Sequence, residues 1–271
     1  MGCQASTASS PAGPLLPFPH ASGKKTVVIV GFSIAGFTVG EQLWDSHNVV
    51  FVDQRDHFEY WPGNLKQAVD GGIKDKIITP FADVLKGYKN AFQFVQGRLL
   101  NVQKEANVIE VATDKDGSKR GTLQYDVLVL CTGFTYNNPI RSDSVYTVQG
   151  RKNNLETFAK QVDAAKNIAV VGSGIVAVEL AGEIAYHAKA AEKKVSLIVR
   201  GEKILGQLDS KAGQAAEEHL KSKNVEIHYK TPDSDKLKKE KGFDLVFECT
   251  GQTYNSDFLK KNFNSSVAKN G

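Results

Sequence analysis

The feature of the 271-residue sequence that most constrains its fold is an internal repeat of two short motifs. A glycine-rich segment that follows an apolar run occurs at residues 31–36 and again at residues 172–177. The motif Cys-Thr-Gly-x-Thr-Tyr-Asn occurs at residues 131–137 and again at residues 249–255. In both halves of the chain the glycine-rich segment comes first. An ordered repeat of this kind predicts two homologous folding units.

The first glycine-rich segment has the sequence context of a nucleotide-binding turn. It follows the apolar run Thr26–Val30, and the next apolar run, Val49–Val52, ends at Asp53. A buried parallel strand, a glycine turn, a helix and a second strand that ends in an acid are the successive parts of a dinucleotide-binding fold. Gly31 would permit the tight turn, and Gly36 would let the helix pack closely on the strand. Asp53 would accept hydrogen bonds from ribose hydroxyls.

Ser33 takes the place of the middle glycine in the G-x-G-x-x-G fingerprint. Its Cβ would crowd a bound pyrophosphate slightly, but serine is the smallest polar replacement. The spacing also differs from the G-x-S-x-G turn of serine hydrolases, because Ala35 stands where that turn has its second glycine. We therefore expect a dinucleotide site here and not a nucleophilic serine.

The second glycine-rich segment keeps both leading glycines. The predicted strand Asn167–Val171 is followed by Gly172, Ser173, Gly174 and Ile175, which begin a G-x-G-x-x-A sequence. The next predicted strand, Lys194–Val199, is followed by Arg200, at a position where sites specific for NAD usually have an acid. An arginine there can bind the 2′-phosphate of NADPH, so we expect NADPH to be accepted, alone or beside NADH. The alternative is that Arg200 is only a solvent-exposed cation at the strand end.

The N-terminus carries a candidate lipidation signal. Its first six residues, Met-Gly-Cys-Gln-Ala-Ser, match the N-myristoylation pattern with Gly2 as the acceptor. Cys3 is a candidate for palmitoylation, and a second acyl chain is needed because one myristoyl chain binds membranes only marginally. The alternative is a chance match. Residues 1–23 would form a flexible tether, and we expect a cytoplasmic protein attached to a membrane surface through its N-terminus.

Composition argues against several other classes of protein. The three cysteines (Cys3, Cys131 and Cys249) have no paired spacing, which excludes a disulfide scaffold and favours a reducing compartment. The six histidines are scattered without metal-ligand spacing, so no metal site is expected. The net charge is only +4, and a small lysine run at residues 236–241 does not indicate specific nucleic-acid binding.

Two nucleotide folds in series, each closed by a strand that ends in Thr-Gly, resemble the two-dinucleotide-binding-domain flavoproteins. This family includes the pyridine nucleotide-disulfide oxidoreductases, and the resemblance covers residues 24–271. The chain lacks the cysteine pair that disulfide reductases carry after the first helix. The segment Phe58–Pro62 is similar to the alternative NADH dehydrogenases, and the Gly2 signal is similar to that of apoptosis-inducing-factor homologues.

The resemblance implies an α/β fold of two tandem Rossmann-like units, with the second inserted into the first. Residues 24–144 would form the N-terminal part of the FAD-binding domain, and residues 145–257 would form the NAD(P)H-binding domain. Residues 258–271 would begin the return to the FAD domain. In this family the return carries a Gly-Asp segment that contacts the flavin, so we expect the remainder to lie beyond Gly271.

The resemblance also implies which residues contact the cofactors. The pyrophosphate and adenosine of FAD would contact Gly31, Ser33, Ile34, Ala35, Gly36, Asp53, Gln54, Arg55, Leu99, Leu100, Thr132 and Gly133. Pro62 and Lys66 would lie close to the flavin. NAD(P)H would contact Gly172, Ser173, Gly174, Ile175 and Arg200, with Glu179 and Gly251 near the nicotinamide.

The expected function is that of a FAD-dependent NAD(P)H oxidoreductase that passes electrons to a quinone-type acceptor at a membrane. No catalytic side chain is expected, because the cofactors carry the chemistry. Two alternatives stay open. One is a nucleotide-binding signalling or scaffold protein without turnover, and the other is a reductase of a protein acceptor such as a ferredoxin. The sequence does not indicate the oligomeric state.

Overall fold

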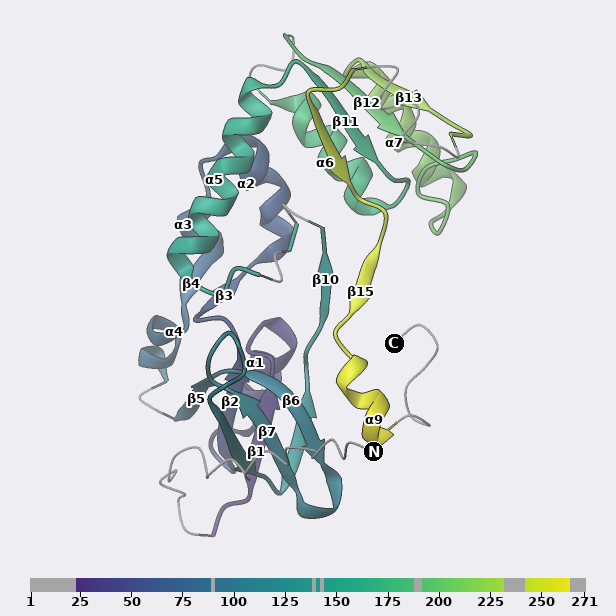
Figure 1. The fold of residues 1–271 in the computed structure, drawn as a ribbon. Coiled ribbons are helices and arrows are strands. Elements are labelled where there is room, and N and C mark those ends of the chain that lie inside the picture. Colours follow the sequence, from purple (N-terminus) through teal and green to yellow (C-terminus); the bar gives the residue numbers. More distant parts are fainter. Residues whose placement is uncertain are drawn as a thin grey trace, which may run out of the picture. The chain divides into compact units, whose positions relative to one another are not determined.

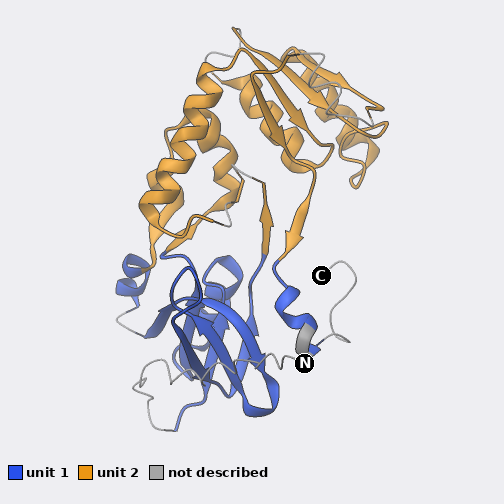
Figure 2. Cartoon of the chain, in the orientation of Figure 1, with its two compact units in different colours: residues 1–56, 82–133, 255–271 blue, residues 57–81, 134–254 orange. Residues whose placement is uncertain are grey.

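The computed structural model describes residues 23–88, 91–137, 140–141, 144–187, 192–231 and 242–263 (Figure 1). The chain divides into two compact units, which Figure 2 shows in different colours. Unit 1 comprises residues 1–56, 82–133 and 255–271, and unit 2 comprises residues 57–81 and 134–254. Unit 2 is therefore inserted between parts of unit 1 along the chain, as expected. Residues 1–22 of the expected tether, including Gly2 and Cys3, and the lysine run lie outside the described residues.

The parallel sheet of unit 1 has the strand order β5-β2-β1-β9. Its strands are β1 (Thr26–Val30), β2 (Asn48–Asp53), β5 (Phe92–Gln96) and β9 (Val127–Leu130), and α1 (Ile34–Leu43) connects β1 to β2. All five residues of β1 are buried. Branched side chains suit this position because a central parallel strand is covered on both faces.

An antiparallel sheet in unit 1 packs on the parallel one. It contains β6 (Arg98–Gln103), β7 (Val108–Ala112) and β8 (Arg120–Gln124) in that order. Val102, Ile109 and Leu123 share one hydrophobic core with Val28 and Val50 of the parallel sheet. The shorter elements are α4 (Phe81–Gly87), which begins at the unit boundary, η2 (Lys104–Ala106), η4 (Asp257–Leu259) and α9 (Lys260–Phe263).

The parallel sheet of unit 2 repeats this arrangement with the strand order β13-β12-β11-β14. Its strands are β11 (Asn167–Val171), β12 (Lys194–Ile198), β13 (Val225–His228) and β14 (Leu245–Glu248). The helices α6 (Ile175–Tyr186) and α7 (Ser210–Ser222) belong to the same unit. In each unit the strand before the glycine turn lies beside the strand that ends in Cys-Thr-Gly. Two Rossmann-like units of α/β type are thus present, as the repeat predicted.

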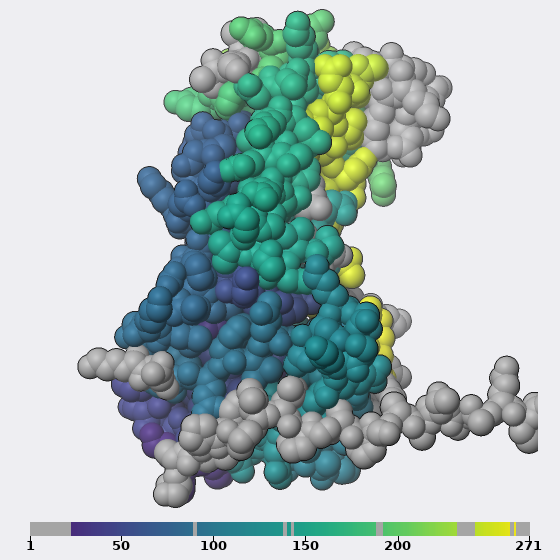
Figure 3. Space-filling model, turned by 60° about the vertical axis from the view of Figure 1, so that its left-hand side comes forward, coloured from purple at the N-terminus to yellow at the C-terminus, as the bar shows by residue number. Residues whose placement is uncertain are grey.

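Residues 57–81 group with unit 2, although the expected division placed them in the FAD-binding domain. They form β3 (His57–Glu59), η1 (Trp61–Gly63), α2 (Asn64–Asp70), α3 (Lys74–Ile77) and β4 (Ile78–Pro80). Leu65 and Val69 of α2 enter the core of unit 2, and α2 packs against α5 (Val148–Ala164). Figure 3 shows the blue surface of this segment beside the teal surface of α5.

A buried polar cluster holds this segment on α5. The Arg151 side chain of α5 is 1% exposed, and its Nε donates to Glu59 Oε1 at 2.5 Å. Asn64 Nδ2 donates to the same carboxylate oxygen at 2.8 Å and to the carbonyl of Ile140 at 2.7 Å. The charge of the buried carboxylate is therefore balanced by the guanidinium, and the neutral amide of Asn64 adds a hydrogen bond to it.

The two copies of the Cys-Thr-Gly-x-Thr-Tyr-Asn motif pair with each other. Strand β10 (Phe134–Tyr136) from the first copy runs antiparallel to β15 (Gln252–Tyr254) from the second, with Thr135 opposite Thr253. Each threonine holds the same position in its own copy, so the pairing has a local two-fold symmetry. The chain passes from unit 1 to unit 2 just before β10 and returns just after β15.

Among the described residues, no helix is both long enough and apolar enough to cross a membrane. The same residues contain no group of three or more histidine, cysteine or acidic side chains that could hold a metal ion.

Candidate functional site

A pocket of about 1000 Å³ lies at the carboxyl ends of the strands of unit 2, and we call it the strand-end pocket. It is lined by the glycine turn, by the end of β12 and by the Cys-Thr-Gly segment after β14, together with Tyr136, Gln207 and Thr231. The strand order reverses between β11 and β14, and Rossmann folds bind dinucleotides across that point. The pocket thus lies where the sequence predicted a nucleotide.

The two repeated motifs of each unit meet in the structure. Gly172 has a φ of +145°, and a Cβ on it would lie 2.6 Å from the carbonyl oxygen of Cys249. Gly31 in unit 1 has a φ of +104°, and its Cβ would lie 2.2 Å from the carbonyl oxygen of Cys131. A side chain at either position would be both strained and in collision. Glycine is therefore required in each turn, because the backbone of the Cys-Thr-Gly segment lies where a side chain would have to be.

The N-terminus of α6 opens into the strand-end pocket without a side-chain cap. Its N-cap residue is Gly174, no side chain accepts a hydrogen bond there, and the first turn contains no acid. A Cβ on Gly174 would meet nothing within 4 Å, and Ile175 is 60% exposed. Free N–H groups and the positive end of the helix dipole attract a phosphate group. The residues present therefore fit the pyrophosphate of NAD(P)H.

Arg200 lies in the loop directly after β12 and lines the strand-end pocket. Backbone hydrogen bonds fix this loop against the segment after β13, from Lys230 N–H to Gly201 O at 2.9 Å and from Thr231 N–H to Val199 O at 3.1 Å. Glu202, the nearest acid in sequence, pairs with Lys230 Nζ at 3.0 Å. Within the described part of the chain, Arg200 has no ion-pair partner, so its guanidinium is available to an anionic ligand.

In unit 1 the predicted FAD residues gather at the carboxyl ends of three adjacent strands. The turn after β1 and the start of α1 hold Gly31, Ser33, Ile34, Ala35 and Gly36. The end of β2 holds Asp53, followed by Gln54 and Arg55, and the segment after β9 holds Thr132 and Gly133. The helix α1 also lacks a side-chain cap at its N-cap residue Ser33. Its free N–H groups fit a phosphate in the same way as those of α6.

The Asp53 carboxylate has a structural role in addition to the predicted contact with ribose. Its Oδ2 accepts a hydrogen bond from Phe32 N–H at 2.8 Å, and its Oδ1 accepts one from Arg55 N–H at 2.9 Å. The carboxylate therefore holds the glycine turn against the end of β2. Each oxygen keeps a second lone pair for a ribose hydroxyl.

Thr132 is fixed by hydrogen bonds in unit 1, and the two remaining predicted adenosine contacts, Leu99 and Leu100, lie on a separate strand. Thr132 Oγ1 donates to the carbonyl of Asn255 at 2.8 Å, and Asn255 Nδ2 donates back to the carbonyl of Thr132 at 3.0 Å. Leu99 and Leu100 lie on β6, where the pairing with β7 is irregular between Leu99 and Asn101. The extra residue, Leu100, thus sits at a β-bulge, a feature that redirects side chains near binding sites.

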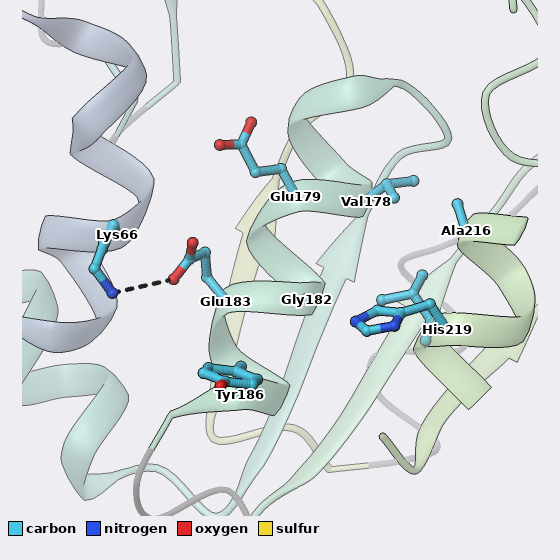
Figure 4. A pocket seen from close by; sticks show the side chains of 9 residues that line it. Lys66, Val178, Glu179, Gly182, Glu183, Tyr186, Ala216 and His219 are labelled. Atoms are coloured by element: carbon cyan, nitrogen blue, oxygen red, sulfur yellow. Dashed lines mark ion pairs between the residues drawn. The ribbon is translucent and has the colours of Figure 1, made fainter. Parts of the chain in front are cut away.

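Lys66 and Glu179 line a second pocket, of about 530 Å³, between α2, α6 and α7, which we call the α6 side pocket (Figure 4). In the figure, Glu179, Glu183 and Tyr186 lie on the side of α6 that faces Lys66, and His219 of α7 lies on the other side. Lys66 Nζ is 3.2 Å from Asp70 Oδ2 and 3.9 Å from Glu183 Oε2. Pro62 lies in η1, just before α2.

Charges in the α6 side pocket influence one another. The hydrogen bond to Asp70, with the charge of Glu183, raises the pKa of Lys66. Burial, with the charge of Glu183, raises the pKa of Glu179. Sequence reasoning missed Glu183, although its place four residues after Glu179 puts both acids on one helix face. It also missed Tyr136, which lies in the first copy of the repeated motif but lines the pocket of the second unit. Gln207 and Thr231 were missed because their segments have no nucleotide-binding pattern of their own.

A family model described as pyridine nucleotide-disulphide oxidoreductase matches residues 25–271. The chain belongs to this family. Two relatives illustrate its place among the pyridine nucleotide-disulphide oxidoreductases. Apoptosis-inducing factor homolog B of Dictyostelium discoideum is 29% identical over 76% of this chain and 52% of its own length. Ferroptosis suppressor protein 1 of Homo sapiens is 27% identical over 92% of this chain and 69% of its own length. The chain thus spans between about half and about two thirds of the length of these relatives.

Solved structures of other oxidoreductases share the fold. A water-forming NADH oxidase from Lactobacillus brevis bound to NADH has a TM-score of 0.67 and 19% identity, over 92% of this chain and 58% of its own. NDH2 from Plasmodium falciparum in complex with NADH has a TM-score of 0.65 and 16% identity, over 88% of this chain and 58% of its own. The predicted α/β fold is confirmed, and the expected cofactors, FAD and NAD(P)H, are those of the family.

Proposed function

We propose that this member of an NAD(P)H-dependent flavoprotein oxidoreductase family passes electrons to a quinone-type acceptor at a membrane surface. The observation that carries the proposal is the strand-end pocket, where the uncapped α6 N-terminus and Arg200 offer an anion site at the strand-order reversal. The chemistry that bound FAD would supply is hydride acceptance from NAD(P)H and electron transfer to the acceptor. The chain's own residues bind and orient the two dinucleotides.

The cysteines support an acceptor other than a protein disulfide. Burial, with the charge of Glu248, raises the pKa of Cys249 to about 12. Burial also raises the pKa of Cys131. A thiol must be a thiolate to react, so neither cysteine suits thiol–disulfide exchange at neutral pH. Each is also far in sequence from any other cysteine, so neither forms a closely spaced redox pair. Electrons would therefore leave the flavin directly to a diffusible acceptor, and a quinone is the class that the likeness to alternative NADH dehydrogenases favours.

The donor side of the proposal includes both nicotinamide cofactors. Arg200 would bind the 2′-phosphate of NADPH, while the α6 N-terminus would hold the pyrophosphate that NADH and NADPH share. Thr231, which follows β13, also lines the pocket. We therefore expect turnover with either donor.

The test is a flavin spectrum followed by an acceptor panel. Purified protein should be yellow, NAD(P)H should bleach it without oxygen, and a short-chain ubiquinone should restore the colour. Protein that binds NADH but no added FAD, and therefore shows no turnover, would contradict the proposal and favour a nucleotide-binding scaffold. Protein that is bleached, ignores a panel of quinones and is reoxidised by a ferredoxin would instead favour a protein acceptor.

A further inference from the structure

Tyr136 belongs to the strand-end pocket, although it precedes the first strand of the second nucleotide-binding unit by about thirty residues. It ends β10, and its backbone pairs with Gln252, which also lines the pocket. The pairing of the two repeated motifs therefore brings a side chain of the first motif to the binding site formed by the second. Its equivalent in the second motif, Tyr254, does not line this pocket and is 40% exposed.

The place of Tyr136 indicates which part of a bound dinucleotide it would meet. The pyrophosphate would lie at the N-terminus of α6, and the adenosine would lie over the end of β12 beside Arg200. The other half of the ligand must then extend across β11 towards β14. The chain after β14 runs from Cys249 to Gln252, which is the partner of Tyr136. Tyr136 thus stands on the nicotinamide side of the pocket.

Aromatic packing fixes the Tyr136 ring. It meets the Phe134 ring edge-on, at 5.4 Å between centroids and an interplanar angle of 90°. Phe134 in turn meets Trp61 at 5.4 Å and 84°, and the Arg141 guanidinium lies 5.2 Å from its centroid. A ring held in this way loses little further freedom when a ligand packs on it, which favours binding.

The protonation state of Tyr136 also suits a residue on the nicotinamide side of the pocket. Burial, together with Cys249 and Tyr254, raises the pKa of the phenol. The side chain therefore stays neutral through the physiological range and keeps a hydroxyl that can donate a hydrogen bond. A neutral aromatic surface with one polar edge matches a nicotinamide, which has a flat ring and a carboxamide.

We infer that Tyr136 is a binding residue for the nicotinamide ring of NAD(P)H. The inference rests on the proposed function, since it assumes that the strand-end pocket takes this donor. It assigns the repeated Thr-Tyr-Asn sequence a role beyond joining the units, because one copy supplies part of the site formed by the other. The tyrosine ring contributes by packing, and the hydroxyl adds a hydrogen bond.

The test compares a ligand that has the nicotinamide with one that lacks it. Dissociation constants for NADH and for ADP-ribose are measured by calorimetry on the purified full chain with FAD. Tyr136→Ala should weaken NADH binding about tenfold and leave ADP-ribose within about twofold. Tyr136→Phe keeps the ring and should lose less than the alanine variant. Tyr88→Ala, a change at a tyrosine of unit 1 that does not line the pocket, should leave both constants unchanged.

The possible outcomes separate the inference from the function on which it rests. An unchanged NADH constant in Tyr136→Ala, with wild-type protein that binds NADH, overturns the inference alone. Equal weakening of NADH and ADP-ribose also overturns it, because that pattern means a general loss of pocket structure. Wild-type protein that binds neither ligand contradicts the proposed function itself.

Discussion

At the scale of single residues, Arg200 is the side chain on which the choice of donor depends. It follows β12, lines the strand-end pocket and has no ion-pair partner within the described ranges. A guanidinium that meets a phosphate gains a charge-assisted hydrogen bond, which only NADPH offers at this end of the molecule.

Replacing Arg200 by alanine should therefore reduce kcat/KM for NADPH about tenfold or more. The value for NADH should change by no more than about twofold, because NADH has no 2′-phosphate. Steady-state rates with a fixed quinone give both values. Lys160→Ala, which removes an exposed cation on α5 away from the pocket, serves as the control. An unchanged ratio of the two values would show that Arg200 is only a solvated charge.

Arg151 is the residue whose loss should most affect stability. Arg151→Met would remove the guanidinium that pairs with the Glu59 carboxylate, which is 7% exposed inside unit 2. Breaking a buried pair in this way costs about 3–5 kcal/mol, so the urea midpoint should fall clearly. Lys152→Met is the matched control, since the Asp75 partner of that neighbouring lysine is 71% exposed. Equal effects of the two changes would contradict the importance assigned to the buried pair.

These two arginines differ in how far the sequence could predict them. Arg200 was identified because a fixed order of strand, glycine turn, helix and strand places its position at the pocket. Arg151 was not, because its partner Glu59 lies 92 residues away and no local pattern links them. The same reason explains why Tyr136 was missed as a pocket residue. Positions within a local sequence motif can thus be predicted here, whereas contacts between residues far apart in the sequence cannot.

At the scale of elements, the two halves of the chain share a further feature that lies outside the two repeated motifs. Asp126 and Asp244 both directly precede the strand that ends in Cys-Thr-Gly. Asp126 Oδ2 accepts from Thr26 N–H at 2.7 Å at the start of β1. Asp244 Oδ2 accepts from Asn167 N–H at 2.8 Å at the start of β11. Each acid thus joins the beginnings of two neighbouring parallel strands.

The sign of the pKa shift of Asp244 predicts a pH effect. Hydrogen bonds from the backbone of Asn167 and Lys166 lower its pKa below the ordinary 3.8. The stabilising contribution of the carboxylate is therefore present above that value and is lost as the pH falls through the folded-state pKa. Between pH 6 and about pH 3, wild-type protein should lose more of its urea midpoint than Asp244→Asn.

The control for this pH series is Asp45→Asn, a change at an exposed acid just after α1. It should follow the wild-type pH dependence closely. Parallel curves for wild type and Asp244→Asn would contradict the role assigned to the carboxylate.

At the scale of the whole molecule, the repeat allowed the two-unit architecture to be predicted, but not the membership of residues 57–81. Their pattern is short, and Leu65 and Val69 gain their burial from α5 and α6, which come much later in the chain. The glycine turns, by contrast, carry their own context on either side. Residues 57–81 follow unit 1 in the sequence but pack in unit 2, and a packing choice of this kind can be recognised only once the fold is known.

The attachment of the whole molecule to a membrane is the last prediction, and it rests on Gly2 and Cys3. Proposed reduction of a quinone requires access to an acceptor that dissolves in lipid. Two acyl chains on the N-terminus would supply that access, because one myristoyl chain gives an association constant of only about 10⁴ M⁻¹.

In cells that have N-myristoyltransferase, Gly2→Ala should move the protein to the soluble fraction. Cys3→Ser should leave a weak, salt-independent association, and Ser9→Ala should behave as wild type. Membrane recovery that is the same for Gly2→Ala and wild type would mean that the lipid signal is a chance match and that the acceptor is reached by another route.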